Sequence, residues 1–299
     1  MVYTITFNPA IDYVVYTDQM ETGKTNRSKC EQIYFGGKGI NVSLVLNELG
    51  IKSKALGFTA GFTGDAIEKG IAAAGIDTDF VHLDNGFSRI NVKIRLKDET
   101  ELNGQGPYIS EEAIRQLFNK LDKLIDNDTL VLAGNIPSSL PSDIYEKILE
   151  YLAGKKLRIV VDATKDLLLN TLKYKPFLIK PNDYELSEMF GVNLDSIDDI
   201  AIYAAKLKEM GASNVLVSMA GNGALLIDEH GTIHKCGVCK GTVKNSVGAG
   251  DSMVAGFIAG YNCGYEYAIK LGTAAGGATA FSDGLAKKEL IYQLLGQLI

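Results

Sequence analysis

Residues Asn245–Phe257, with the sequence NSVGAGDSMVAGF, join three small residues to the start of an apolar helix. Met253, Val254 and Phe257 follow Gly248–Gly250 with helical spacing, which predicts that the helix begins at the glycines. The first N–H groups of a helix have no acceptor inside the helix, and the helix dipole favours negative charge there. Because Gly248, Ala249 and Gly250 carry almost no side chain, an anion can approach these N–H groups closely. The stretch therefore predicts an anion-binding helix N-terminus.

Asp251 lies in the first turn of this predicted helix, beside the place where the anion would bind. A carboxylate next to a phosphoryl group suggests a general base that accepts the proton of a hydroxyl group. The alternative is a glycine-rich turn followed by an ordinary acidic residue of a first helical turn. The rest of the chain has to decide between the two.

The composition of the 299 residues is that of an ordinary globular protein, with 46% hydrophobic and 22% charged residues. A net charge of −6 without a basic run argues against binding to nucleic acid or to an acidic membrane. The sequence shows neither a signal peptide nor an apolar run of membrane-spanning length. Four scattered cysteines suit a reducing compartment, so we expect a cytoplasmic protein.

Apolar strands alternate with helices through the second half of the chain. The predicted strands cover residues 129–133, 158–162, 177–180 and 214–219, and helical patterns lie between them. Fully apolar strands in this rhythm indicate a parallel sheet that is covered on both faces. The chain shows no linker, so we expect one α/β domain over residues 1–299.

A second glycine-rich helix start occurs in Phe35–Ser43, where Gly36, Gly37 and Gly39 surround Lys38. It is suited to backbone contact with a ligand, but it is not a Walker loop, because a glycine rather than Ser or Thr follows Lys38. Asp12 follows a short strand that Pro9 ends, and ligands gather beyond the carboxyl ends of the strands in such sheets. Asp12 is therefore a candidate polar contact.

The segment Arg89–Lys97 alternates apolar and polar side chains, which predicts a strand with one basic face exposed to solvent. Asp98 and Glu99 would turn the chain back. Together with residues 11–35, the hairpin in residues 87–106 would form a small β-sheet lid; a solvated edge ribbon is the alternative. An exposed lid edge makes a homodimer through the lid conceivable.

Gly221 and Gly223 form a Gly-x-Gly pattern that is also found in dinucleotide-binding sites. Here Asn222-Gly223 stands between two β-type runs, which indicates a hairpin, and no helix follows. The pattern therefore argues against a dehydrogenase.

Three motifs together resemble the pfkB carbohydrate kinases, which have the ribokinase-like fold. They are the glycine-rich start at 36–41, Asn182 followed three residues later by Glu185, and the stretch 247–252. The resemblance covers essentially the whole chain in the right order, and the pairing of the two glycine motifs is specific. It implies a mainly parallel central sheet with helices on both faces and a small β-sheet lid.

Within the family, residues 8–12 and 101–107 resemble the branch that acts on phosphorylated ketohexoses, and above all its bacterial 1-phosphofructokinases. The resemblance implies ATP- and Mg²⁺-dependent phosphorylation of fructose 1-phosphate at its 6-hydroxyl. The alternatives are a tagatose-6-phosphate kinase and a non-catalytic regulator that binds a nucleotide or a sugar phosphate.

The resemblance also implies roles for single residues. Asp251 would be the base, and the N–H groups of Gly248, Ala249 and Gly250 would stabilise the transferring phosphoryl group. Glu185 would organise Mg²⁺ through water, although Asn182 and Glu185 also have the spacing of a capping box. Asn135 stands where many members have Ser. The substrate contacts would be Asp12, Gly37, Lys38, Asn41 and Asn135, with Arg27 and Arg89 on the existing phosphate, and the nucleotide contacts Asn182, Ser218, Ala220, Gly221 and Gly223.

Overall fold

The computed structural model describes residues 1–96 and 99–298, so the turn predicted at Asp98 lies outside the described residues. The path through the main sheet runs β14-β13-β12-β11-β10-β9-β1-β4-β5, with β6 paired to β4. Neighbours from β5 to β12 are parallel, whereas β12, β13 and β14 pair antiparallel. The predicted mainly parallel α/β sheet is confirmed. Its strands are β1 (Val2–Thr6), β4 (Ser53–Ala60), β5 (Asp77–Thr78), β6 (Val81–Leu83), β9 (Thr129–Ala133), β10 (Arg158–Asp162), β11 (Leu178–Ile179), β12 (Asn214–Ser218), β13 (Ala224–Ile227) and β14 (Ile233–Cys236).

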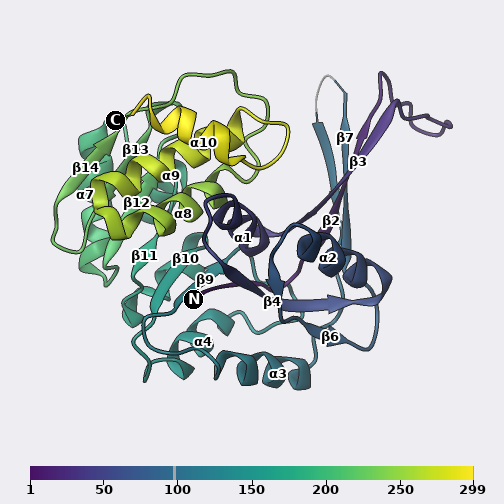
Figure 1. Cartoon of the computed structure of the whole chain (residues 1–299), viewed down its shortest axis with the longest axis horizontal. Coiled ribbons are helices and arrows are strands. Elements are labelled where there is room, and N and C mark those ends of the chain that lie inside the picture. Colours follow the sequence, from purple (N-terminus) through teal and green to yellow (C-terminus); the bar gives the residue numbers. More distant parts are fainter. Residues whose placement is uncertain (97–98, 299) are drawn as a thin grey trace.

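Helices cover both faces of this sheet (Figure 1). In β9, Leu130 and Leu132 pack into the buried cluster under α3, α4 and α7, while Val131 and Ala133 pack into the cluster under α8, α9 and α10. A strand buried on both faces has no polar side, which explains its continuous apolar sequence. The helices are α1 (Lys38–Glu48), α2 (Gly61–Ala73), α3 (Glu111–Leu121), α4 (Ile144–Tyr151), α5 (Lys165–Leu169), α6 (Asp183–Phe190), α7 (Ile197–Glu209), α8 (Ala249–Gly260), α9 (Tyr265–Ala280) and α10 (Lys288–Leu295).

Helices α8 and α9 touch through glycines. A Cβ atom added to Gly256 would lie 2.6 Å from the carbonyl oxygen of Leu271, and one added to Gly272 would lie 2.9 Å from that of Met253. Because real Cβ contacts are not so short, only glycine allows this approach. The run of small residues at 272–280 thus packs against a neighbouring helix. This packing fixes the position of α8, and with it the position of its glycine-rich N-terminus.

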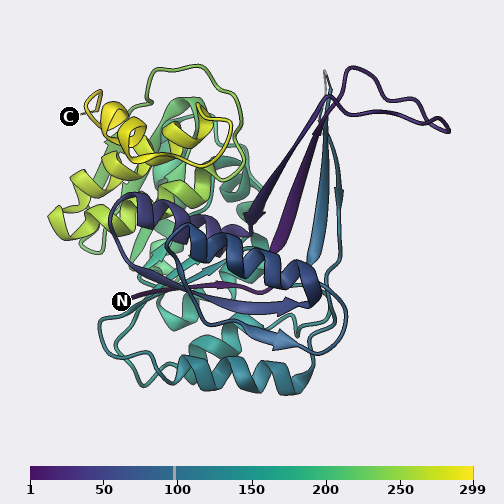
Figure 2. The same cartoon turned by 45° about the vertical axis from the view of Figure 1, so that its right-hand side comes forward.

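A second sheet of four strands, in the order β3-β2-β7-β8, projects from the main body (Figure 2). Its strands are β2 (Ala10–Tyr16), β3 (Cys30–Gly36), β7 (Arg89–Arg95) and β8 (Glu99–Asn103). They lie, to within one residue, inside the two segments predicted for the lid, about 11–35 and 87–106, and this second sheet is called the lid sheet below. Asp12 follows the end of β1, as predicted, and lies inside the next strand, β2, of the lid sheet.

The prediction that the polar face of β7 meets solvent was wrong. Asn91 and Lys93 are 7% and 8% exposed, because this face covers the clefts between the lid sheet and the main body. The apolar face turns outward, and Ile33 and Leu102 are 57% and 72% exposed. Alternation in a strand shows that its two faces differ, but not which face another layer covers.

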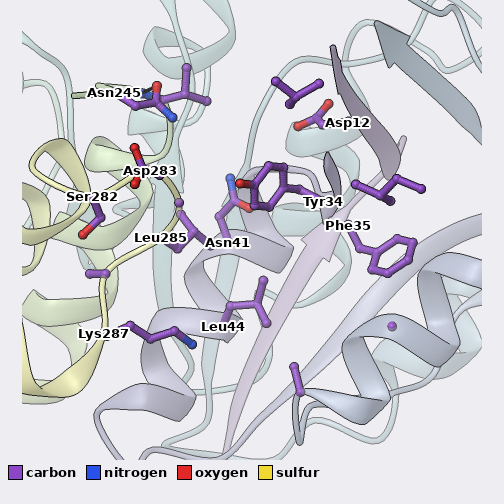
Figure 3. A pocket seen from close by; sticks show the side chains of 18 of the residues that line it. Asp12, Tyr34, Phe35, Asn41, Leu44, Asn245, Ser282, Asp283, Leu285 and Lys287 are labelled. Atoms are coloured by element: carbon purple, nitrogen blue, oxygen red, sulfur yellow. Dashed lines mark hydrogen bonds between the residues drawn. The ribbon is translucent and has the colours of Figure 1, made fainter. Parts of the chain in front are cut away.

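A cavity of about 570 Å³ lies between the lid sheet and the main body (Figure 3). Tyr34 and Phe35 of β3 line one side of it, and Leu44 of α1 and Leu285 line the other. The hairpin predicted at Asn222-Gly223 is confirmed, since β12 and β13 pair antiparallel on either side of it. Among residues 1–96 and 99–298, none of the helices combines the length and the apolar character needed to cross a membrane.

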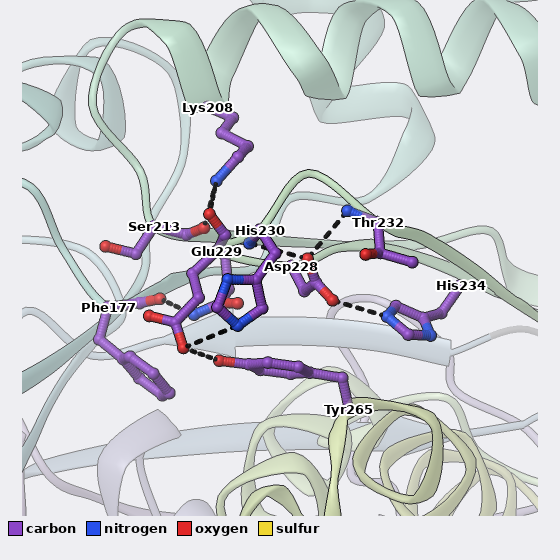
Figure 4. A network of polar contacts seen from close by, with 10 residues as sticks. Phe177, Lys208, Ser213, Asp228, Glu229, His230, Thr232, His234 and Tyr265 are labelled. Atoms are coloured by element: carbon purple, nitrogen blue, oxygen red, sulfur yellow. Dashed lines mark hydrogen bonds and ion pairs between the residues drawn. The ribbon is translucent and has the colours of Figure 1, made fainter.

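The turn between β13 and β14 is built around the carboxylate of Asp228 (Figure 4). Asp228 Oδ1 accepts hydrogen bonds from the backbone N–H groups of His230 and Thr232, each at 2.9 Å, and His234 Nε2 lies 2.9 Å from Oδ2. The hydroxyl group of Tyr265, at the start of α9, donates a hydrogen bond of 2.6 Å to Glu229 in the same turn. Burial alone would raise the pKa of Asp228, but its hydrogen bonds outweigh burial and lower it.

We expect Asp228→Asn to lower the melting temperature at pH 7, because the buried amide cannot accept all these hydrogen bonds. The expected decrease in the free energy of unfolding is about 1–3 kcal/mol. A carboxyl whose pKa is lowered by folding stabilises the protein above its unfolded pKa, and this contribution fades as pH falls through the folded pKa. The difference from wild type should therefore shrink in acid, as measured by thermal melting from pH 7 to pH 4 and below.

Asp198→Asn is the control, because Asp198 is exposed and forms a surface ion pair with Lys235. It should leave the melting temperature nearly unchanged. An Asp228→Asn loss that stayed constant down to the lowest pH would contradict a role of the ionised carboxylate.

Candidate active site

Helix α8 begins where the glycine motif predicts. Its N-cap is Gly248, whose φ of 81° lies in the left-handed region that favours glycine. The N–H group of Ala249 is bonded to the carbonyl of Ser246 at 3.2 Å. Among the described residues, no turn or loop carbonyl accepts a hydrogen bond from the N–H group of Gly250 or Asp251, and no side chain caps the helix, so both N–H groups can bind an anion.

Helix α1 begins at the second glycine motif and packs directly on the end of β1. A Cβ atom at Gly39 would lie 2.6 Å from the carbonyl oxygen of Ile5, and one at Gly37 would lie 2.4 Å from Thr6 Cγ2. Thr6 Oγ1 accepts a hydrogen bond from the N–H group of Ile40 at 3.0 Å. The glycines therefore let α1 lie close enough to β1 to bring Asn41 beside α8.

Asp251 is 4% exposed, and Asn41 Nδ2 donates a hydrogen bond to its Oδ2 at 2.8 Å. Burial, followed by the charge of Asp162, raises the pKa of Asp251 to about 6, although Lys38, Asn41 and Lys180 act in the opposite direction. At neutral pH the carboxylate is then mainly ionised and is a stronger base than an ordinary aspartate. The site therefore holds a group able to take a proton from a hydroxyl.

The lid sheet closes one side of this site with polar side chains. Asn91 Nδ2 donates to Asp12 Oδ1 at 2.7 Å, and Lys93 Nζ lies 3.0 Å from a carboxylate oxygen of Glu101. Arg89 Nε donates to the carbonyl of Asn8 at 3.0 Å, which leaves its two terminal nitrogens for other acceptors. These side chains surround a second cavity, of about 430 Å³, which shares Asp12, Asn41, Lys93 and Val247 with the first.

This 430 Å³ cavity brings together residues from most of the predicted motifs. Asn182 and Glu185 form the capping box, with bonds of 2.6 and 2.8 Å, so the structural interpretation of that motif is confirmed, while both residues also line the cavity. The predicted residues in its wall are Asp12, Gly37, Lys38, Asn41, Arg89, Asn182, Glu185, Ser218, Gly248, Gly250 and Asp251.

Several predicted residues lie outside the described walls of both cavities. Arg27 is exposed in the segment between β2 and β3, which extends away from the main body (Figure 2). Asn135 is exposed beyond the end of β9, and Ala220 and Gly221 are exposed in the short turn after β12. Gly223 has a φ of 86° and closes the β12–β13 hairpin. Ala249 lies at the helix start without lining either cavity.

Sequence reasoning missed Asp162 and Lys180, which are 2% and 5% exposed in the wall of the site. Asp162 ends β10 and Lys180 follows β11, so both stand at the carboxyl ends of parallel strands. A charged residue directly after an apolar strand is the signal that could have found them. Asn91 and Lys93 were also missed, because this face of β7 was expected to meet solvent, and so were Glu101 and Asn103 of β8.

The model of the pfkB family of carbohydrate kinases matches residues 4–290. The chain belongs to the pfkB carbohydrate kinase family. This kinase is therefore a phosphotransferase, as the resemblance implied.

The kinase is 46% identical to the 1-phosphofructokinase of Bacillus subtilis, over 100% of this chain and 98% of that protein. It is 38% identical to the D-tagatose-1-phosphate kinase of Bacillus licheniformis, again over 100% and 98%. The structure of phosphofructokinase-2 from Escherichia coli, in complex with substrates and products, superposes with a TM-score of 0.91 at 25% identity and covers 99% of both chains.

The kcat/KM of this kinase for its sugar acceptor should fall as pH drops below about 6, because only ionised Asp251 accepts a proton. The measurement is a pH–rate profile with ATP in excess. In Asn41→Ala the acidic limb should move to higher pH, since the hydrogen bond that lowers the pKa of Asp251 is gone. A limb that stays in place in the variant would belong to the substrate and not to Asp251.

Proposed function

We propose that this kinase transfers the γ-phosphoryl group of ATP to the 6-hydroxyl of fructose 1-phosphate. The observation that carries the proposal is the buried Asp251 at the start of α8, with its raised pKa and its hydrogen bond from Asn41. The hydroxyl oxygen would form a bond to the γ-phosphorus, and the bond to the bridging oxygen of ADP would break. The hydroxyl proton would pass to Asp251, and the free N–H groups of Gly250 and Asp251 would stabilise the charge on the moving group.

Asp12, Gly37, Lys38 and Asn41 would hold the sugar, which is supported by their position in the 430 Å³ cavity. The terminal nitrogens of Arg89 make no hydrogen bond to a described residue, and they suit the phosphate that the substrate already carries. Arg27 and Asn135 would join them only after the segments that carry them move. The nucleotide would lie along Asn182, Ser218, Ala220, Gly221 and Gly223.

Mg²⁺ would enter this site with the nucleotide. Among the described residues no group of three His, Cys, Asp or Glu is placed to hold a metal ion. Mg²⁺ tends to keep water and to bind substrate phosphates, so a site with few protein ligands suits it. Glu185 would contact the ion through water; its Oε2 already accepts the N–H group of Asn182, which orients the carboxylate.

The sequence left open whether the substrate carries its phosphate on carbon 1 or, as in tagatose 6-phosphate, at the other end of the sugar. The relatives from Bacillus act, by their names, on fructose 1-phosphate and on tagatose 1-phosphate. Both substrates are ketose 1-phosphates, which favours a 1-phosphate and makes tagatose 1-phosphate the second candidate. The four cysteines are free, which suits the cytoplasm in which we expect the enzyme to work.

The test is an ADP-release assay with ATP, Mg²⁺ and one acceptor at a time. We expect the highest kcat/KM for fructose 1-phosphate, against tagatose 1-phosphate, tagatose 6-phosphate, fructose 6-phosphate and ribose. Asp251→Asn is the control, and its kcat should fall by several orders of magnitude while ATP affinity stays nearly intact. A preference for another sugar would show that the proposed substrate is wrong. Turnover of Asp251→Asn within about tenfold of wild type would show that Asp251 is not the base. Binding of the ligands without turnover would favour a non-catalytic regulator.

We also propose that the lid sheet closes over the sugar and that its outer face joins two copies of the chain. The inner face carries the polar residues of the site, and closure would exclude water as a competing acceptor. Tyr13, Ile33, Val92 and Leu102 form one apolar row across all four strands of the outer face. An apolar row on a protruding sheet matches the same row of a second copy, which supports a homodimer. The sequence suggested a dimer interface at the edge of the lid, whereas the apolar row supports an interface on the outer face of the lid sheet.

Leu102→Glu should shift the protein from dimer to monomer in sedimentation velocity, because it places a charge in the apolar row. Ile202→Glu is the matched control, since Ile202 is a similarly exposed residue on α7, away from the lid sheet. The control should remain dimeric. A wild type that is monomeric at all concentrations would contradict the proposed interface.

A further inference from the structure

Asp162 is a buried carboxylate for which the family motifs and the proposed reaction provide no role. Its Oδ1 lies 3.3 Å from Lys180 Nζ, and its Oδ2 lies 3.5 Å from Lys38 Nζ. Oδ2 accepts no hydrogen bond within the part of the chain that the structure describes. Burying a charge is costly unless opposite charges lie close, so the three side chains depend on one another.

Lys38 belongs to the start of α1, and Lys180, which follows β11, reaches the start of α8 with its side chain. Lys38 is the first residue of α1, and Lys180 Nζ lies 3.1 Å from the position that a Cβ atom of Gly250 would take. Asp162 stands between them at the end of β10, so its carboxylate links the sugar side of the site to the phosphoryl side. Burial alone would lower the pKa of Lys38, but Asp162, with smaller effects of Asp251 and Glu185, raises it, so this ammonium stays charged.

We propose that Asp162 is a positioning residue that holds Lys38 and Lys180 in the cavity wall that also contains Asp251, so that these three charged groups together set the charge around Asp251. The proposal deepens the proposed function and rests on it for the reaction. Among the described residues, the side chains that act most on the charge of Asp251 are Asp162 from β10, Lys180 after β11, and Lys38 and Asn41 from α1. Of these, Asp162 is the one that raises the pKa of Asp251, whereas the others lower it. The charged residues Asp12, Arg89, Lys93, Glu101 and Glu185 line the same cavity.

Two substitutions should therefore move the same titration in opposite directions. In Asp162→Asn the repulsion disappears, and the pKa of Asp251 should fall below about 6, while burial, the larger cause of its rise, remains. In Lys180→Gln an attraction disappears, and the pKa of Asp251 should rise. Carbon-detected NMR of the ligand-free enzyme measures this directly, with Asp251→Asn identifying the resonance. General disruption of the fold would not produce shifts of opposite sign.

Turnover supplies the second measurement. Asp162→Asn should lower kcat by about a hundredfold, as expected when charged groups lose their position, and it should move the acidic limb of kcat/KM to lower pH. Asp228→Asn is the matched control, because Asp228 is also a buried aspartate but lies in the β13–β14 turn away from the site. The control should lose stability and keep its kcat and its pH profile.

The outcomes separate this inference from the proposed function. An enzyme inactive on every sugar offered would refute the function, while the NMR shifts would still test Asp162. An unchanged pKa of Asp251 in both variants would overturn the inference and leave the function standing. A higher Mg²⁺ requirement of Asp162→Asn with an unmoved pKa would also overturn it, in favour of a metal ligand. If Asp162→Asn does not fold, the upward shift in Lys180→Gln decides alone.

Discussion

The hydrogen bond between Asn41 and Asp251 joins two helix starts that lie 210 residues apart in the chain. It can form only because glycines bring both helices close to their neighbours. Gly37 and Gly39 allow α1 to pack closely on β1. Gly256 and Gly272 allow α8 to pack closely on α9. A side chain at these contacts would push the helix starts apart, and with them the anion site and the carboxylate. The geometry of the site thus depends on close backbone packing.

Buried charge gives this geometry its chemistry. Asp251 is buried, so its charge is balanced more by the lysines and the amide near it than by solvent. Asp162 and Lys180 are also buried, so the charge of each one strongly affects the other. A site of this kind is prepared for anionic substrates before they arrive, because its charges and N–H groups are already oriented.

The lid sheet shows how one element serves two surfaces. Alternation in its strands places Asp12, Asn91 and Lys93 over the cavities and leaves an apolar row outside. A shift of one residue in register would exchange the two faces and remove the polar wall of the site. The polar inner face and the apolar outer face of the sheet are therefore coupled through its strand register.

The sequence by itself determined the α/β class, the two glycine-rich helix starts, the hairpin after β12 and the position of Asp251. These features are local, because glycine conformation, turn chemistry and apolar spacing act over a few residues. Only the tertiary structure decided that Asp162 meets Lys180 and Lys38, that the polar face of β7 is covered, and that Arg27 and Asn135 lie outside the cavities. Those facts depend on which strands are neighbours and which layer covers a face. No local pattern contains them, since contacts between distant segments follow from the packing of the whole chain.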